Sequence, residues 1–235
     1  MRKLLVILVA ICATAQVRVP GPGGEGASAS SGITFVNAAS ESPSIGTGTV
    51  TLSVTAGNLL YGFASDQSGG TALAVSDPQN GSWNLQGSQY GSSTGAGINT
   101  AQFSTANSYT GSLTIAITSN ASNSNPVLTV YQFHGQTSAT AVSTGSGNLG
   151  TSSPITSNAF SASAGNLILF GIGIHGTSTC AAGIPTGMTI PVNGNPSGSN
   201  GAGCVEYVIA PSSETTATLA WTGSSWVVGQ AAVFH

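Results

Sequence analysis

The sequence predicts an all-β protein made of two tandem jelly-roll-like, Greek-key β-sandwich units that are related by internal duplication. Short apolar runs of strand length alternate with clusters of Gly, Ser and Asn, which is typical of a sandwich or barrel. Lys, Arg and Glu, which favour helices, are rare, and no stretch has a convincing helical period. One phrase is also written twice along the chain, which indicates a repeated unit.

The first 15 residues are predicted to be a secretory signal peptide. A basic start, MRK, precedes an apolar run from Leu4 to Ile11 that is too short to cross a bilayer. The small residues of the segment 13–15 then form a cleavage site. We therefore expect an exported protein that begins near residue 16 and is secreted without insertion into a membrane.

A flexible arm and two sandwich units are expected to follow the signal peptide. Residues 16–32 are rich in Pro, Gly and Ser and contain almost nothing to bury, so they predict a flexible arm. Unit 1 is predicted over 33–137 and unit 2 over 138–235. Each unit has seven or eight predicted strands, and the sequence leaves open whether the units form separate sandwiches or one fused body.

Three segments show the predicted strands most clearly. Residues 111–119 (GSLTIAITS) alternate apolar and polar side chains, which predicts a strand with one buried face. Residues 126–134 and 225–235 are apolar along most of their length and are typical of central strands. Asn-Gly pairs such as Asn80-Gly81 separate the runs and predict tight turns, because both residues tolerate positive φ.

The repeated phrase supports the duplication. TAGNLLYGFAS covers residues 55–65, and SAGNLILFGIG covers residues 163–173. The pairs Phe133-His134 and Phe234-His235 recur at the ends of the two units, and the intervening elements follow in the same order. We interpret AGNL as a tight turn that leads into a buried strand once in each unit.

The combination of AGNLL, SDPQNGSWNL and the closing GSSWVVGQAAVFH resembles a broad group of exported, mostly uncharacterised bacterial proteins with a duplicated jelly-roll-like β-sandwich. The resemblance covers nearly all of residues 33–235. It implies the fold and export, and it implies no activity and no catalytic residue.

Charge excludes two classes of partner. From residue 16 onward the chain has one cation, Arg18, and six acidic side chains, so its net charge is one minus six, or −5. Nucleic-acid binding and binding to anionic membranes both require a basic surface. The same scarcity leaves strand edges without the Lys residues that usually protect them, so either loops and bulges cover the edges or the edges pair with a partner. On the second interpretation we expect self-association through strand edges or through the arm.

Two cysteines remain after the signal peptide, and they predict a disulfide between Cys180 and Cys204. The alternative is a pair of free thiols. Two cysteines without a His at ligand spacing do not form a zinc site, so no metal and no cofactor are expected.

Candidate ligand contacts lie in the first unit. Trp83, Tyr90, Asp77 and Asn80 are assigned to a tentative carbohydrate site, because aromatic rings stack on sugars and amides bind hydroxyl groups. The alternative for Trp83 is a core residue, and the alternative for Asp77 is a turn in which its side chain accepts hydrogen bonds from its own backbone. A further alternative, weighed and not preferred, is Ca²⁺ bound by Asp66 and Asp77.

No catalytic residue is assigned. GSSTG (91–95) matches a nucleophile elbow, but it is predicted to lie in a loop without the helix that the elbow needs. GSGNLG (145–150) matches a dinucleotide loop outside any βαβ unit. His134, His175 and His235 are interpreted as strand-end residues. The sequence thus favours a non-catalytic extracellular structural or adhesive protein that self-assembles; a carbohydrate-binding module is the alternative and a secreted hydrolase a distant third.

Overall fold

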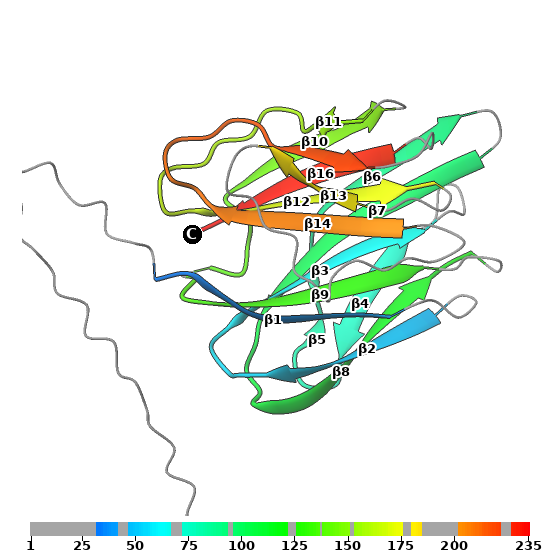
Figure 1. Ribbon diagram of the computed structural model, residues 1–235. Helices are drawn as coiled ribbons and strands as arrows, with labels where there is room; N and C mark the ends of the chain where they lie inside the picture. The colour runs from blue at the N-terminus through cyan, green and yellow to red at the C-terminus, as the bar shows by residue number, and fades with distance from the viewer. Residues whose placement is uncertain are drawn as a thin grey trace, which may run out of the picture.

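The computed structural model describes the ranges 32–41, 47–66, 72–93, 96–121, 126–136, 138–150, 153–175, 180–184, 202–221 and 227–235. The predicted signal peptide and all of the predicted arm except Gly32 lie outside these residues. Every regular element in the described ranges is a β-strand, which confirms the all-β class (Figure 1). Within the same ranges, no helix is long and apolar enough to cross a membrane.

Nine strands form the first unit. They are β1 (Thr34–Glu41), β2 (Thr47–Val54), β3 (Leu59–Asp66), β4 (Leu73–Asp77), β5 (Gly81–Ser82), β6 (Asn84–Ser93), β7 (Ala96–Ala106), β8 (Gly111–Ser119) and β9 (Val127–His134). Seven described strands form the second unit. They are β10 (Ser143–Gly150), β11 (Ile155–Thr156), β12 (Leu167–Ile174), β13 (Cys180–Ile184), β14 (Ala202–Ile209), β15 (Thr218–Trp221) and β16 (Val227–Phe234).

The two units share one topology. In the first, one sheet has the order β1-β9-β3-β7-β6 and the other the order β2-β8-β4-β5, so that the first strands alternate between sheets as in a jelly roll. In the second, the corresponding sheets have the orders β10-β16-β12-β14 and β11-β15-β13. The strands common to both units therefore follow the same order, and β5 and β6 have no counterpart among the described strands of the second unit. The origin of the two units by duplication stays a prediction.

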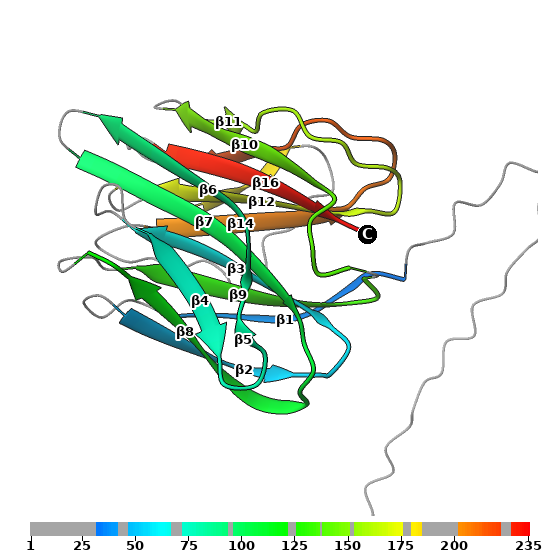
Figure 2. The same cartoon turned by 180° about the vertical axis from the view of Figure 1, so that it is seen from behind.

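The two sandwiches pack face to face through their larger sheets. One apolar core lies inside each sandwich, and a third joins Tyr61, Phe63 and Phe133 of the first unit to Leu169 and Phe234 of the second. The molecule thus has four layers of sheet. In Figure 1 the second unit, yellow-green to red, lies above most of the first, and the view from behind in Figure 2 shows β6 close to β16 and β10.

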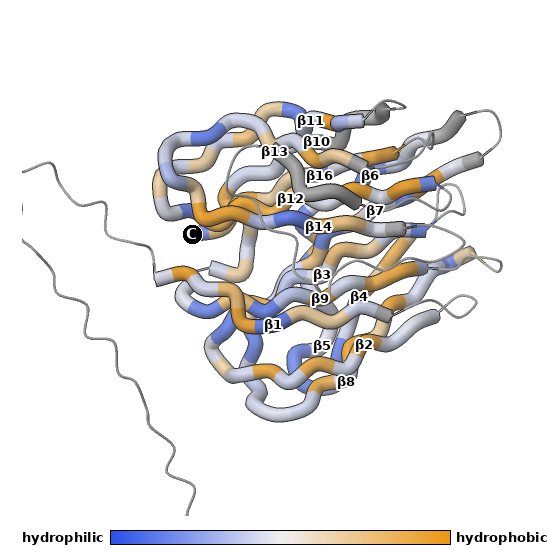
Figure 3. The backbone as a smooth tube through the Cα atoms, in the orientation of Figure 1, coloured by the Kyte–Doolittle hydropathy of each residue, from blue (hydrophilic) through white to orange (hydrophobic). Residues whose placement is uncertain are grey.

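The strand predictions are confirmed. The alternating segment 111–119 is β8, and its apolar side chains are buried while its threonines are exposed. In Figure 3, orange and pale segments alternate along β2 and β8. The continuously apolar segments become β9 and β16, which are central strands of the two larger sheets, and each of the eight residues of β16 is buried.

The AGNL phrase forms the same turn in both units, as expected. Gly57 and Gly165 have φ values of 86° and 88°. Residues other than Gly adopt such positive φ values only at a cost in conformational energy. The Gly57 N–H donates to the Asn107 carbonyl at 2.8 Å, and the Gly165 N–H donates to the Ala210 carbonyl at the same distance. Each turn leads into a strand that is buried along its whole length.

Glycines on β12 allow the close contact between the two sandwiches. A Cβ at Gly171 would overlap the ring of Phe63, and a Cβ at Gly173 would overlap the Thr100 methyl group. When the AGNL phrases are aligned, Phe63 and Gly171 occupy the same position of their units. A bulky and a small residue at equivalent positions therefore pack against each other at the centre of the interface.

Candidate functional site

Asp77 ends β4 and organises the turn that follows. Its Oδ1 accepts the backbone N–H groups of Gln79 at 2.8 Å and Asn80 at 2.7 Å. Its Oδ2 accepts the Asn80 side-chain amide at 3.0 Å and the Trp83 indole N–H at 2.7 Å. Burial alone would raise the pKa of this carboxyl, but these four hydrogen bonds outweigh burial and hold the pKa below its ordinary value.

Asn80 and Trp83 are bound into the same turn. The Asn80 Oδ1 accepts the Ser108 backbone N–H at 2.9 Å, and its Nδ2 donates to the Asn107 side chain at 3.2 Å. The Trp83 ring is 5% exposed and belongs to the inner core of the first sandwich, where it packs against Gly62. The arrangement favours the structural interpretation of Asp77, Asn80 and Trp83, because their polar groups are bonded within the chain.

Tyr90 lies apart from this turn on the edge strand β6. Its side chain is 46% exposed, opposite Asn99 of the neighbouring strand β7. Leu85 lies opposite Phe103 of β7. Phe103 and Asn99 are four residues apart on β7 and therefore lie on the same face of the sheet, which places their partners Leu85 and Tyr90 on one face of β6. The structure thus brings together three of the four predicted carbohydrate contacts and leaves Tyr90 separate from them, on a face of β6 where Leu85 is also exposed.

The histidines end strands, as the sequence predicts. The His134 Nδ1 lies 2.9 Å from the Asn58 Oδ1 of the first AGNL turn, and His175 follows β12. Asp66 accepts a hydrogen bond from the Ser119 hydroxyl at 3.1 Å. Ser119 pairs with Leu73, the first residue of β4, whereas Asp77 is the last, so the two aspartates lie at opposite ends of one strand. This separation argues against a single Ca²⁺ site that contains both.

The two motif matches in the sequence lie largely within strands. Gly91 to Ser93 of GSSTG end β6, which the sequence had placed in a loop, and GSGNLG falls inside β10. Neither match therefore has the strand-turn-helix context that its chemistry requires.

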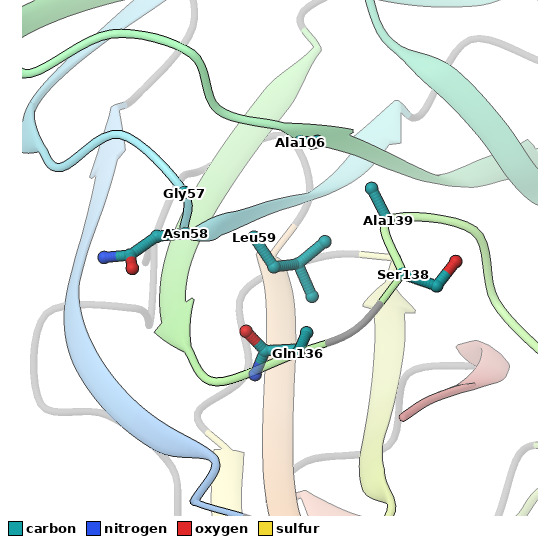
Figure 4. Close-up of a pocket in the computed structure, with 7 residues that line it drawn as sticks. All are labelled: Gly57, Asn58, Leu59, Ala106, Gln136, Ser138 and Ala139. Atoms are coloured by element: carbon teal, nitrogen blue, oxygen red, sulfur yellow. The ribbon is translucent and has the colours of Figure 1, made fainter.

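Each AGNL turn also lines a pocket. The first, shown in Figure 4, has a volume of about 220 Å³ and is lined by Asn58, Leu59 and the linker residues Gln136, Ser138 and Ala139, together with Gly57 and Ala106. Both amide atoms of Gln136 are buried and without a hydrogen-bond partner. The second pocket, of about 550 Å³, contains Asn166, Glu214 and His235, and the Ser212 hydroxyl donates to Glu214 at 3.0 Å. The sequence analysis missed both pockets, although the repeated Asn of AGNL marks their position.

The predicted disulfide is compatible with the described backbone. Cys204 is fully buried in β14, and Cys180 begins β13, which contacts β14. The side chain of Cys180 lies outside the described residues, so the pairing stays a prediction.

The strand edges differ in how they are protected against pairing. Among the described strands that end a sheet, four contain extra residues that shift their register, and each shift lies on the edge strand: β1, β6, β10 and β13. Such β-bulges twist an edge and interrupt its row of backbone groups. Two further edge strands, β5 and β11, have only two residues each.

Two edge strands, β2 and β14, are long and regular. β14 pairs with β12 without any shift in register and contains the charged residue Glu206. β2 is eight residues long, pairs with β8 without any shift in register, and contains no charged residue and no proline. On its other side it pairs with no described strand. The sequence left open whether bulges cover the edges or the edges pair with a partner. Bulges lie on four of the described edge strands, whereas β2 is long, regular and uncharged.

Comparisons with known proteins add no assignment. No family model matches the chain, and neither curated proteins nor solved structures give a match.

Proposed function

We propose that this chain is an exported, non-catalytic β-sandwich protein that serves as an extracellular structural or adhesive component and self-associates through strand edges. The observation that carries the proposal is the chemistry of those edges. No Lys or Arg follows Arg18, and β2, β6 and β10 contain no charged residue. Electrostatic repulsion therefore does not oppose contact between the edges of two copies.

The outer faces of the sandwiches support the same role. Threonine pairs cross the outer sheet in both units: Thr51 and Thr114 hydroxyls lie 3.4 Å apart, and Thr156 and Thr218 hydroxyls lie 2.9 Å apart. These residues are exposed or half-buried and uncharged. An uncharged hydroxyl surface remains hydrated without the long-range repulsion that keeps highly charged proteins apart.

The titratable groups with described contacts also support a non-catalytic role. Asp77 stabilises a turn, and His134 contacts Asn58. The predicted signal peptide, residues 1–15, places the protein outside the cell under this proposal, and the predicted Cys180–Cys204 disulfide suits that oxidising environment.

Assembly of the exported form tests the proposal. We expect the chain from residue 16 to give larger particles as its concentration rises, as measured by light scattering and sedimentation velocity, with ordered assemblies in electron micrographs. A chain beginning at Ser31 keeps the described body and removes the arm, so it separates assembly through edges from assembly through the arm. A monomer at every concentration would contradict the proposal.

Exposure of Tyr90 supports one second candidate, a carbohydrate-binding role. Tyr90 presents an exposed aromatic ring of the kind on which the apolar face of a sugar stacks, and Leu85 is exposed on the same face of β6. A panel of glycans would then raise the melting temperature of the wild type and leave Tyr90→Ala unchanged. An equal rise in both proteins would exclude this patch as the site.

A further inference from the structure

We infer that β2 is the edge through which two copies of this chain join, in an antiparallel pair that makes one continuous sheet from two outer sheets. The inference rests on the proposed function and specifies which surface performs it. The occupant is a second copy of the chain, and the contact is between β2 and β2.

The backbone of β2 is oriented for such a pair. Alternate residues of a strand direct their N–H and C=O groups to opposite sides. The Ser53 carbonyl accepts the Asn37 side-chain amide at 2.8 Å, and the Thr55 N–H donates to the Gln132 side chain at 2.7 Å, so these odd-numbered residues direct their groups away from β8. Thr49 and Thr51 have the same parity and therefore present their N–H and C=O groups to the outer edge.

The hydrogen bonds between β8 and β4 lead to the same conclusion about which residues of β2 direct their backbone groups outward. The Asn120 N–H donates to the Ala72 carbonyl next to β4. The even-numbered residues of β8 therefore direct their backbone N–H and C=O groups toward β4, and the odd-numbered residues direct theirs toward β2. Ile115 pairs with Val50, and Ile117 pairs with Gly48. The backbone groups of the even-numbered residues of β2 are thus directed to β8, and those of Thr49 and Thr51 remain for a new neighbour.

A second copy fits this edge better than an unrelated strand because β2 is complementary to itself. With Val50 opposite Val50 of the second copy, Thr49 of each copy lies opposite Thr51 of the other, and their backbone groups match. No like charges meet, because β2 contains none. The exposed hydroxyls of Thr49 and Thr51 continue the row made by Thr114 on β8.

The other edges support this choice by contrast. A bulge lies on each of β1, β6, β10 and β13, and such an irregularity opposes the addition of a flat strand. β5 and β11 have only two residues each, and β14, although regular, contains the charged residue Glu206. At one end of β2, Asn37 and Gln132 already bind the Ser53 carbonyl, so the new pairing is limited to the part of the strand around Thr49 and Thr51.

Charge placed on this edge tests the inference. The double variant Thr49→Lys/Thr51→Lys puts two ammonium groups on the free edge, where they face those of the second copy. The matched control, Thr114→Lys/Thr118→Lys, adds the same charge to exposed positions of the same sheet face, on a strand that is paired on both sides. We expect the β2 variant to require at least about tenfold more protein to assemble, and the control to stay within about twofold of the wild type.

A competition experiment avoids any effect of substitution on folding. A peptide of residues 47–54, TGTVTLSV, added to the wild-type chain should occupy the edge and reduce assembly, whereas a peptide of the same composition in scrambled order should not. Melting temperatures of all variants confirm that they are folded.

The outcomes separate the inference from the proposed function. A wild-type chain that stays monomeric overturns both. A wild type that assembles while the β2 variant assembles equally well, or while the control is equally impaired, overturns the β2 inference and leaves self-association intact. Assembly that needs only residues 16–30 would place the contact in the arm and would also overturn it.

Discussion

The two sandwiches have the same topology but contribute different side chains to the interface between them. At equivalent positions of β3 and β12, the first unit has Tyr61 and Phe63 where the second has Leu169 and Gly171. The larger side chains of the first unit fill space that the smaller residues of the second leave open. The comparison teaches that a shared strand order does not imply a shared surface, and that complementary size holds the two units together.

Removal of the Phe63 ring should have the largest effect. The ring is 1% exposed and lies against Gly171, so Phe63→Ala leaves a cavity that the glycine cannot fill. We expect a loss of about 3–5 kcal/mol in the free energy of unfolding, measured by urea titration. Phe35→Ala is the control in the same interface, where the side chain is only half-buried and the loss should be smaller.

The predicted Cys180–Cys204 bond would distinguish the second unit from the first, since the first contains no cysteine. It closes a loop of about 25 residues, and its reduction should cost about 3 kcal/mol in the chain-entropy model. Thiol counting on the denatured protein and melting with and without reductant give the measurement. Two titratable thiols before reduction would rule the bond out.

A methyl group at Gly171 tests the complementarity from the other side. Gly171→Ala should destabilise the fold by about 1–3 kcal/mol, because its Cβ overlaps the Phe63 ring. The penalty should shrink in the Phe63→Ala background, where room for the methyl group exists. Gly203→Ala is the comparison, since its Cβ would lie 3.2 Å from the Ser65 Oγ and 3.5 Å from the Phe63 ring, so the Phe63→Ala background should change its effect less. Additive effects of the two substitutions would refute direct packing.

The Asp77 turn gives the smallest expected effect. Asp77→Asn loses acceptor capacity for the Asn80 and Trp83 donors, and we expect a loss of about 1–2 kcal/mol near neutral pH. Because the folded pKa is lowered from 3.8, the contribution of the carboxylate is present above pH 4 and is lost as pH falls through the lower folded pKa. The stability difference between wild type and variant should therefore narrow on acidification, and a constant gap from pH 3 to pH 7 would contradict this account.

Much of the fold could be predicted because local pattern determines it. Alternation in 111–119 and continuous apolar character in 126–134 correctly indicate an outer and a central strand. The Gly of AGNL indicates a turn because positive φ is a local requirement. The packing of the two sandwiches against each other could not be predicted from local pattern. Hydrophobic periodicity shows that one face of a strand is buried, but it does not show which element covers that face.

The candidate sites also divide into features set by residues close in the sequence, which could be predicted, and features set by residues far apart, which could not. The turn role of Asp77 follows from neighbours within six residues, and the sequence identified it as an alternative. The two pockets and the orientation of β2 depend on residues far apart in the chain, such as Asn58 with Gln136 and Ser53 with Asn37. Gly171 and Gly173, two glycines on one face of an apolar strand, are the signal that could have indicated close contact between the sheets.

The packing of the Phe63 ring against Gly171 across the interface limits how the two units can be recombined by protein engineering. Two identical copies that meet about a twofold axis place each axial residue against itself. A chain made of two first units would set Phe63 against Phe63, and one made of two second units would set Gly171 against Gly171 and leave a void. The covalent link between the units removes that constraint, so the halves are not interchangeable parts, and an engineer who recombines them must keep one of each.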